Sequence, residues 1–396
     1  MQPALPSNSP DSLLGGSAGA TSAFPLEPQA LPWHAVQSIG RIRLPWAQAL
    51  RIRLARMRRW EFWPSWVYYG PIVLWIVWLG IKHRSFTVFT ACDPALDAGG
   101  LVGESKHQAL QLLQANAPDL AATYIYVPAD PAGVKQRTAK ALVFAQQHGF
   151  PVVLKPDVGL RGRGVYVARS EQQVCDYISR FGGDLIVQRH IAGEEFGVFV
   201  ARMPGQQQVQ VLSIVNKTFP TVTGDGVLNL RQLILADARA SLISALLLAR
   251  WEAELARVVA QGEVVQLVEI GTHSRGSLFL DACHLATPAL EATLRRLLDA
   301  TPGYAFGRMD LRVPSAAHLE RGEGLKVLEF NGVSSESAHI YHPDTPLWQG
   351  YRAMFVQWSL AFEIGAAYAS QGVPVTSARE LLRLWREDMR RGTAWF

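Results

Sequence analysis

Two segments in the last quarter of the chain carry polar side chains at a spacing that suits metal binding. They read YAFGRMDLRV (304–313) and LKVLEFNGVSSE (325–336). Each has the pattern of a β-strand, in which side chains two residues apart point to the same face. Glu329 and Asn331 therefore share one face of their strand. Arg308 and Asp310 have the same spacing in the other strand.

These side chains suggest chemistry on a phosphorylated or acylated substrate. Asp310, Glu329 and Asn331 supply oxygen ligands, which Mg²⁺ prefers when it also bridges phosphate groups. Arg308 could stabilise an oxyanion or an acyl phosphate beside them. The alternative interpretation is a set of salt bridges at a sheet edge, although carboxylates rarely lie within apolar strands without a partner.

A lysine followed by a glycine-rich turn stands earlier in the chain, in VVLKPDVGLRGRGVYV (152–167). Lys155 ends one strand-like run, and the turn contains Gly159, Arg161, Gly162, Arg163 and Gly164. Glycines let backbone N–H groups approach phosphate oxygens, and the basic side chains could add charge-assisted contacts. The segment is neither a P-loop nor a dinucleotide fingerprint, because no Gly-Lys-Ser/Thr or Gly-x-Gly-x-x-Gly opens a helix. A plain hairpin is the alternative.

A third segment, DLIVQRHIAGEEFGVFVA (184–201), reads as a strand, a turn at Gly193 and a second strand. Backbone groups from Gln188 to Ile191 could pair with the edge of an adenine. Glu195, just beyond the turn, could bind the ribose hydroxyls. The alternative interpretation is an acidic turn that faces solvent.

The elements that must position these residues alternate between strands and helices from Ser85 onwards. The patterns predict strands over 86–91, 124–127, 151–155 and 165–168, and helices over 104–115 and 134–148. Such a mixture indicates an α+β fold.

Taken in chain order, these features resemble the ATP-grasp superfamily over roughly residues 100–345. The order is a lysine with a glycine-rich turn, a hinge that ends in a carboxylate, an Arg-x-Asp strand and a Glu-x-Asn strand. D-alanine–D-alanine ligase and the cyanophycin- and glutathione-synthetase-like carboxylate–amine ligases are the most similar members. The resemblance implies the ATP-grasp fold, in which two α+β lobes clamp ATP.

The resemblance also implies roles at the nucleotide. Lys155 would contact the phosphates of ATP, and the turn Gly159–Gly164 would close over them. Gln188 and Ile191 would lie at the adenine, and Glu195 at the ribose. Lys217, in VNKTFPTVTGDG, is similar to a second phosphate-binding lysine, and Lys106, in GESKHQALQLL, to one at a helix start.

The implied metal and catalytic residues complete the set. Asp310, Glu329 and Asn331 would hold two Mg²⁺ ions, with Mn²⁺ as an alternative, and Arg308 would face the transferred phosphoryl group. Arg275, in GTHSRGSLFLD, would meet a phosphate or a substrate carboxylate, or belong to a surface hairpin. The segment ESAHIYHP (336–343) replaces the final loop of the D-alanine ligases, so substrate identity stays open. So do the roles of His273, His339 and His342.

The implied reaction is ATP-dependent carboxylate–amine ligation through an acyl phosphate, with release of ADP and phosphate. Its partners would be ATP and a small-molecule or lipid-linked carboxylate and amine pair. The chain has no Ser-His-Asp or Cys-His pattern, which agrees with a reaction that needs no covalent nucleophile. Two alternatives stay open: a kinase that phosphorylates a small molecule, and a nucleotide-binding scaffold without catalysis. A homodimer is an expectation from the family.

The net charge of +5 is concentrated near the N-terminus. Residues 1–60 hold seven Arg, no Lys and two acids, and the remainder is neutral. The charge therefore gives no reason to expect a nucleic-acid partner. The three cysteines, at positions 92, 175 and 283, are isolated, which favours a reducing compartment over a disulfide framework.

The basic region adjoins an apolar one. Residues 46–60 predict an amphipathic helix with an arginine-rich face, which suits anionic lipid headgroups or, alternatively, a solvated surface. Residues 62–81 follow without a charge, rich in Trp but interrupted by Pro64, Gly70 and Pro71. Because Arg flanks one end and Lys82 and Arg84 the other, we prefer a re-entrant or interfacial segment to a single span or a buried hairpin. This places the protein in the cytoplasm, at the inner face of the cell membrane.

These patterns give the following domain organisation. We predict a disordered tail over 1–35, a basic helix with an apolar, Trp-rich membrane-associating segment over 36–84, a short N-terminal α/β domain over 85–150, an ATP-grasp domain over 151–370 and a C-terminal helix over 371–396.

Overall fold

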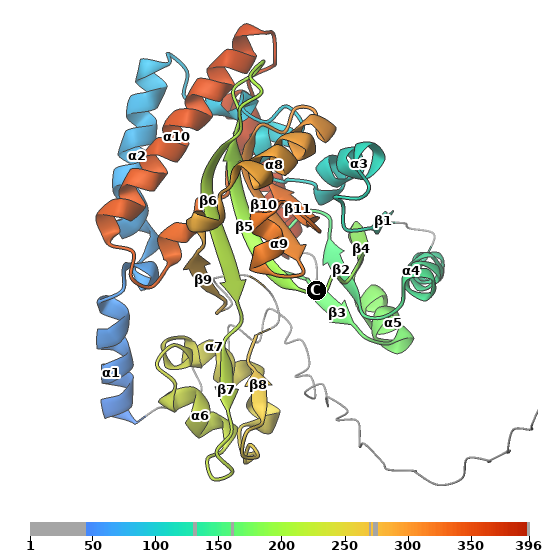
Figure 1. Cartoon of the computed structure of the whole chain (residues 1–396), viewed down its shortest axis with the longest axis vertical. Helices are drawn as coiled ribbons and strands as arrows, with labels where there is room; N and C mark the ends of the chain where they lie inside the picture. The colour runs from blue at the N-terminus through green and yellow to red at the C-terminus, as the bar shows by residue number, and fades with distance from the viewer. Residues whose placement is uncertain (1–44, 130–132, 160–161, 269–270, 272–275, 394–396) are drawn as a thin grey trace, which may run out of the picture.

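The computed structural model describes residues 45–129, 133–159, 162–268, 271 and 276–393. Two antiparallel sheets dominate it, and long helices flank the larger one (Figure 1). The mixed α+β class predicted from the sequence is confirmed. The predicted disordered tail, residues 1–35, lies outside the described residues.

The smaller sheet has the strand order β1-β4-β2-β3. Its strands are β1 (Tyr124–Val127), β2 (Val152–Pro156), β3 (Tyr166–Ala168) and β4 (Leu185–Arg189), and the helices α4 (Val134–His148) and α5 (Glu171–Arg180) pack with them. The inward side chains of β2, Val152 and Leu154, meet Phe144 of α4 and Ile178 of α5 in one apolar core. The predicted domain boundary after residue 150 falls within this sheet, because β1 lies before the boundary and the other three strands lie after it. The domain boundaries remain a prediction.

The larger sheet has the strand order β11-β10-β5-β6-β9. Its strands are β5 (Glu194–Ala201), β6 (Gln210–Thr218), β9 (Leu278–Asp281), β10 (Phe306–Val313) and β11 (Lys326–Asn331). Seven successive residues of β5 are buried because both faces of the sheet are covered. One face packs with α3 (Lys106–Asn116) and α8 (Pro288–Ala300), and the other with α10 (Leu347–Ser370). The short helix α9 (Ala316–Glu320) follows β10, and α11 (Ala378–Thr393) follows α10.

A small third unit projects from the larger sheet between β6 and β9 (Figure 1). It contains the hairpin of β7 (Thr221–Thr223) and β8 (Val264–Gln266), with the helices α6 (Leu230–Ala236) and α7 (Ser244–Arg250). Asn229 and Gln232 form a reciprocal capping box at the start of α6. Trp251 is buried at the centre of this unit and donates to the Leu267 carbonyl at 3.2 Å.

The apolar segment near the N-terminus forms one continuous helix, α2 (Ser65–Lys82), preceded by α1 (Trp46–Met57). Pro71 lies inside α2, where it removes one helical hydrogen bond without ending the helix. Tyr68, Ile72 and Leu79 are buried on its inner side, and the indole of Trp75 donates to the Phe355 carbonyl of α10 at 3.1 Å. Among the described residues, no single helix is both long and apolar enough to cross a membrane.

One predicted strand is wrong. The run over 86–91 contains a single 3₁₀ turn, Val88–Ala91, and all four residues of that turn are buried against the region of α10. A short apolar run has no period that distinguishes a strand from a buried helical turn. Packing against α10 decides between the two here.

Asp93, two residues after this turn, is a buried carboxylate that joins two parts of the fold. It is fully buried, and its Oδ1 accepts hydrogen bonds from the backbone N–H groups of Ala305 and Phe306, both at 2.7 Å. Burial raises the pKa of Asp93 to about 8. Because the folded pKa lies above the unfolded value, folding takes up a proton between about pH 4 and 8, and this group's contribution to stability falls as pH rises through that window.

We predict that Asp93→Asn flattens the pH dependence of stability. The amide oxygen can still accept hydrogen bonds from Ala305 and Phe306 but carries no charge to desolvate. Between about pH 5 and 8, the free energy of unfolding of the variant should therefore rise relative to that of the wild type by roughly 1 kcal/mol per pH unit. Urea unfolding at both pH values measures this. Asp93→Ala, which leaves both N–H groups without an acceptor, should lose about 2–4 kcal/mol at either pH. Parallel pH profiles for the wild type and Asp93→Asn would contradict the assignment.

Candidate functional site

A cleft of about 900 Å³ is lined by residues of both sheets. Its lining includes these predicted site residues: Lys106, Lys155, Gly159, Gly162, Arg163, Gln188, Ile191, Glu195, Lys217, Arg308, Asp310, Glu329 and Asn331. The structure thus brings together segments that are up to 225 residues apart in the chain. Gly164 lies beside this lining, and Arg161 and Arg275 fall outside the described residues.

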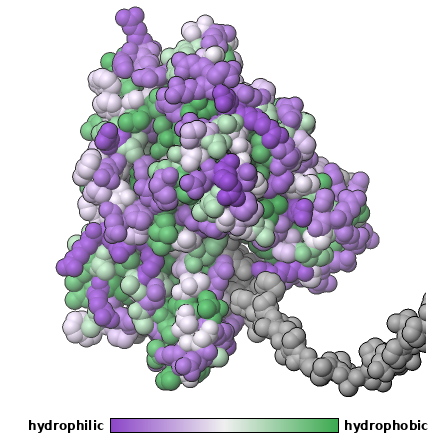
Figure 2. Space-filling view, in the orientation of Figure 1, coloured by the Kyte–Doolittle hydropathy of each residue, from purple (hydrophilic) through white to green (hydrophobic). Residues whose placement is uncertain are grey.

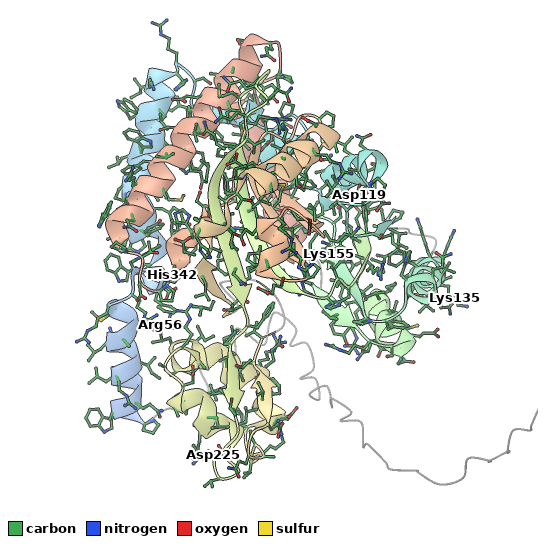
Figure 3. The ribbon with its side chains drawn as sticks, in the orientation of Figure 1. Arg56, Asp119, Lys135, Lys155, Asp225 and His342 are labelled. Atoms are coloured by element: carbon green, nitrogen blue, oxygen red, sulfur yellow. The ribbon has the colours of Figure 1, made fainter. Side chains whose placement is uncertain are left out.

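Two buried lysines line the cleft. Lys155, on β2, donates from Nζ to Gln188 Oε1 at 3.0 Å and to the Leu328 carbonyl at 2.9 Å (Figure 3). Lys106, the first residue of α3, donates to the carbonyls of Asp157 at 3.1 Å and Gly159 at 3.0 Å.

In the part of the chain that the structure describes, neither lysine forms an ion pair with a carboxylate. Burial lowers the pKa of Lys155 to about 8, since desolvation disfavours the ammonium. A buried cation without an anionic partner is costly, and a bound anion would remove that cost. The two lysines therefore suit a phosphate chain.

The glycine-rich turn is held in place at its end. Gly162 and Gly164 have φ angles of 67° and 72°, which side chains with a Cβ rarely adopt. A Cβ on Gly164 would also lie 2.6 Å from Cγ of Pro156. The Tyr177 hydroxyl of α5 donates to the Gly164 carbonyl at 2.6 Å. Arg163, between the two glycines, lines the cleft.

The hinge residues lie along the cleft wall, with internal partners of their own. The Gln188 amide group bonds to Lys155 and donates to the carbonyls of Ala122 at 3.3 Å and Leu328 at 3.2 Å. The Ile191 carbonyl accepts from Arg312 Nη1 at 2.6 Å. The side chain of Gln188 therefore orients Lys155, and a role in adenine binding stays a prediction for the backbone of this segment.

Neighbouring strands of the larger sheet gather a cluster of alternating charges. Lys217 of β6 contacts Asp310 Oδ2 of β10 at 2.8 Å and Glu195 Oε1 of β5 at 3.2 Å. Arg308 Nε contacts Asp310 Oδ1 at 3.0 Å. Burial acts to raise the pKa of Asp310, but Arg308 and Lys217 outweigh it and lower the pKa to about 2. Asp310 is therefore a carboxylate at any physiological pH.

The backbone explains how this cluster fits. In the register of β5 with β10, Asp310 lies opposite Gly197, and a Cβ there would be 3.1 Å from Cδ of Arg308 and 3.3 Å from Oδ1 of Asp310. The absence of a side chain at Gly197 leaves room for the ion pair. Glu195 lies opposite Lys217 on the other side of β5.

The predicted metal ligands lie on paired strands. Asp310 is the direct cross-strand partner of Glu329, and Arg308 is the partner of Asn331. Asn331 Nδ2 donates to Glu329 Oε1 at 3.3 Å, which leaves its own amide oxygen available. Among the described residues there is no group of three His, Cys, Asp or Glu that could hold a metal. The present set has two carboxylates and one amide, a hard-oxygen donor set that fits Mg²⁺ and its retained waters, and metal binding stays a prediction.

Sequence reasoning missed several residues of the cleft. Arg312 contacts Glu195 Oε2 at 3.1 Å and holds the hinge at Ile191; its place two residues after Asp310 on one strand face could have indicated it. Glu336 and the N-terminal residues Trp60, Trp63 and Tyr69 also line the cleft. No local pattern connects residues 60–69 with a site near residue 336.

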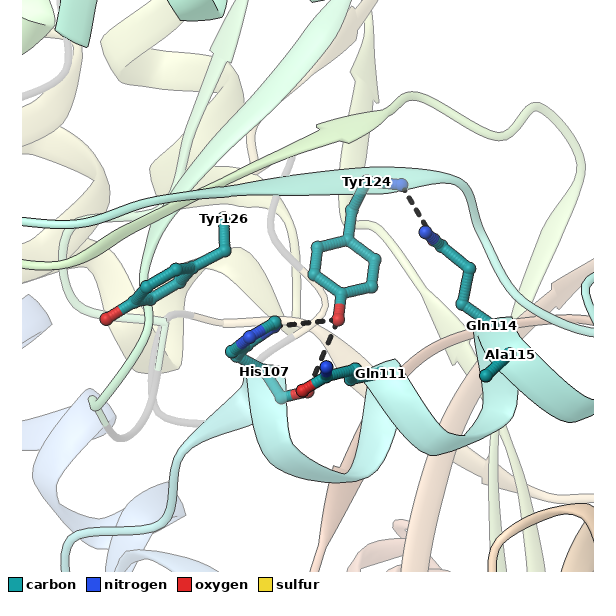
Figure 4. Close-up of a pocket in the computed structure, with 6 residues that line it drawn as sticks. All are labelled: His107, Gln111, Gln114, Ala115, Tyr124 and Tyr126. Carbon is teal, nitrogen blue, oxygen red and sulfur yellow. Dashed lines mark hydrogen bonds between the residues drawn. The ribbon is translucent and has the colours of Figure 1, made fainter.

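The histidines without a predicted role lie elsewhere. His342 Nδ1 accepts from the backbone N–H of Asp281 at 3.2 Å, and the backbone N–H of His339 donates to Ser213 Oγ at 3.2 Å. Neither lines the cleft, and His273 is outside the described residues. A separate pocket of about 340 Å³ lies between α3 and β1, where His107 stacks on Tyr126 (Figure 4). It contains none of the predicted site residues.

Residues 117–182 match the family model of the ATP-binding domain of the carbamoyl-phosphate synthase L chain. This stretch runs from before β1 to just past the end of α5 and includes Lys155 and the glycine-rich turn. This match supports the predicted ATP-grasp superfamily, and ATP is the expected nucleotide. No curated protein sequence matches the chain.

Solved structures of ATP-grasp proteins give remote matches. The chain is 17% identical to a bifunctional glutathione synthetase from Pasteurella multocida, over 63% of this chain and 36% of that one, with a TM-score of 0.34. It is 12% identical to a D-alanine–D-alanine ligase from Bacillus anthracis, over 70% of this chain and 71% of that one, with a TM-score of 0.37. It is 11% identical to D-alanyl-alanine synthetase A from Vibrio cholerae, over 68% of this chain and 65% of that one, with a TM-score of 0.36. The chain thus spans about a third of the length of the glutathione synthetase.

We predict that Lys155→Met weakens nucleotide binding about 10- to 100-fold, since a charge-assisted contact to phosphate is lost while the side-chain length is kept. Calorimetry with a non-hydrolysable ATP analogue measures this. Lys135→Met, at an exposed lysine of α4 in the same lobe, is the matched control. Equal affinities for the two variants would exclude Lys155 from phosphate binding.

The pKa of Lys155 adds a second expectation. Because the free enzyme loses this cation as pH rises through about 8, nucleotide affinity should fall between about pH 7 and 9. Lys155→Met has no proton to lose at this position, so its affinity should change less over that range. A parallel fall in both proteins would assign the pH effect to another group.

Proposed function

We propose that this protein is an ATP-dependent carboxylate–amine ligase that forms an amide bond through an acyl phosphate. The observation that carries the proposal is a single cleft that holds two kinds of charged group. Lys106 and Lys155, buried without an ion pair, suit the phosphates, and the Arg308–Asp310 cluster lines the same cleft.

In the proposed reaction, the γ-phosphoryl group of ATP passes to a substrate carboxylate, and an amine then displaces phosphate from the acyl carbon. Lys106 and Lys155 bind the phosphates, and Arg308, held by Asp310, faces the developing negative charge. Lys217 and Arg308 keep Asp310 ionised. Asp310, Glu329 and Asn331 would hold Mg²⁺, which when bound would neutralise phosphate charge. Most of the catalysis would come from positioning.

We predict that Asp310→Asn and Glu329→Gln each reduce ADP release at least about 100-fold and leave the fold intact, because each removes a charge from the proposed metal set. The assay combines purified protein and Mg-ATP with a panel of amino acids, dipeptides and amine-bearing lipids. Circular dichroism and thermal unfolding check the fold. Full activity in both variants would reject the metal assignment.

The same assay separates the alternatives. Release of ADP that requires one carboxylate and one amine together establishes a ligase. A stable phosphorylated product formed without an amine establishes a kinase. Nucleotide binding without release on every mixture would favour a scaffold.

We also propose that the protein works at the cytoplasmic face of the membrane. The outer side of α2 exposes a row of apolar side chains at helical spacing, comprising Trp66, Val73, Leu74, Val77, Trp78 and Ile81. The side of the molecule formed by α1, α2 and α10 has apolar atoms interleaved with polar ones (Figure 2). The neighbouring helix α1 carries the arginine-rich surface, including exposed Arg51, Arg53 and Arg58. Apolar side chains beside a basic helix suit an anionic lipid surface better than a protein partner of unknown charge.

We predict that in a flotation assay the full chain floats with vesicles that contain phosphatidylglycerol and does not float with vesicles of pure phosphatidylcholine. Leu74→Glu, at a side chain that is 72% exposed, should lower the bound fraction about tenfold because a charge replaces an apolar group at the interface. Val143→Glu, on α4 at 53% exposure, is the matched control and should bind as the wild type does. Equal flotation of the two variants, or none of the wild type, would refute membrane docking by α2.

A further inference from the structure

Part of the cleft wall is built by the segment that joins α1 to α2. Trp60, Glu61, Trp63, Tyr68 and Tyr69 line the same cleft as Lys155. Glu336 and Tyr341, which follow β11, also line it. A segment predicted to associate with a membrane therefore also forms part of the proposed active-site cleft.

This wall is fixed by specific contacts. The Trp60 ring stacks on Tyr68 at 4.7 Å and on Tyr341 at 5.5 Å, and its indole N–H donates to the Thr345 carbonyl at 3.1 Å. Glu61 is held in an ion pair with Arg239 of the small third unit. The wall is thus joined to two other parts of the fold, and its aromatic faces have defined positions.

Glu336 is the charged group at the centre of this wall. Its Oε1 accepts from the Tyr69 hydroxyl and its Oε2 from the Tyr341 hydroxyl. Burial raises the pKa of Tyr341 well above its usual value, so this hydroxyl stays protonated and donates. Within the described ranges Glu336 forms no ion pair, in contrast to Glu61 with Arg239 and Glu195 with Lys217. Its cationic neighbour is Arg308: burial acts to lower the pKa of Arg308, but the carboxylates of Asp310, Glu329 and Glu336 raise it overall.

A carboxylate held between tyrosine hydroxyls and without an ion pair suits a cationic ligand. The carboxylate supplies the charge, and neighbouring tyrosine rings would add attraction to an ammonium group. Glu336 is only partly buried, so a ligand in the cleft can reach it. The same cleft therefore holds lysines without an ion pair and a carboxylate without an ion pair.

We propose that Glu336, with Tyr69 and Tyr341 that donate to it, binds the primary ammonium group of a substrate. The assignment rests on the proposed ligase function, which requires an amine-bearing substrate in this cleft. Alkyl amines are protonated at neutral pH, like the lysine side chain, and enter the site as cations. The negative charge of Glu336 repels anionic ligands, whereas Lys106 and Lys155 attract them.

A direct binding experiment tests the subsite without turnover. Saturation-transfer difference NMR on the full chain, with Mg²⁺ and a non-hydrolysable ATP analogue present, compares n-butylammonium with n-butanol, which has the same chain and no charge. We expect butylammonium to bind and butanol to bind much more weakly. Glu336→Gln keeps the size and the acceptor oxygen of the side chain and removes the charge, so its dissociation constant for butylammonium should rise roughly tenfold.

The control is Glu363→Gln, at an exposed carboxylate on α10 outside the cleft, which should leave butylammonium binding unchanged. Equal affinity of Glu336→Gln and the wild type, or no binding of butylammonium to the wild type, would overturn the subsite. Analogue affinity is measured on each protein and should be the same in all three. The ADP-release assay tests the ligase independently: if it fails while Glu336-dependent binding holds, the reaction is wrong and the subsite stands.

Discussion

The main constraint on this structure is that two lysine cations are buried in a cleft wall without forming an ion pair, which is energetically unfavourable. Lys155 and Lys106 bond only to neutral oxygens in the described structure, and burial already lowers the pKa of Lys155. Desolvated charges of this kind destabilise a fold unless they have a purpose at a binding site. Here the cores of both lobes hold the lysines in position, and a phosphate chain would supply the missing negative charge.

In the larger sheet, by contrast, the buried charges that line the cleft are paired with one another. Its antiparallel register places Lys217 between Glu195 and Asp310, with Arg308 and Arg312 on the far sides of the two acids. Positive and negative groups alternate, so each buried charge has a partner before any ligand binds. This neutralised cluster is consistent with a platform that can exchange a lysine–carboxylate contact for a contact to substrate or metal.

The N-terminal helices have two different surfaces. The inner side of α2 packs in the apolar core against α10, and the segment before α2 contributes aromatic side chains to the wall of the cleft. The outer side exposes the apolar row that we propose for the lipid surface. If both proposals hold, a substrate bound at Glu336 lies next to the part of the protein that contacts the membrane, which would suit an amine carried on a lipid.

The sequence by itself determined the order of the strands that carry function and the face to which each polar side chain points, because alternation along a strand is a local property. That reasoning grouped Asp310 with Glu329, and the family resemblance added Lys155 and Lys217; the structure lines a single cleft with all four. Tertiary structure decided what local pattern cannot express. It packed residues 88–91 as a helical turn against α10, and it brought Arg312 to Glu195 and Trp60 to Tyr341. These contacts join residues more than 100 positions apart, and their energy comes from packing and charge pairing that no window of sequence contains.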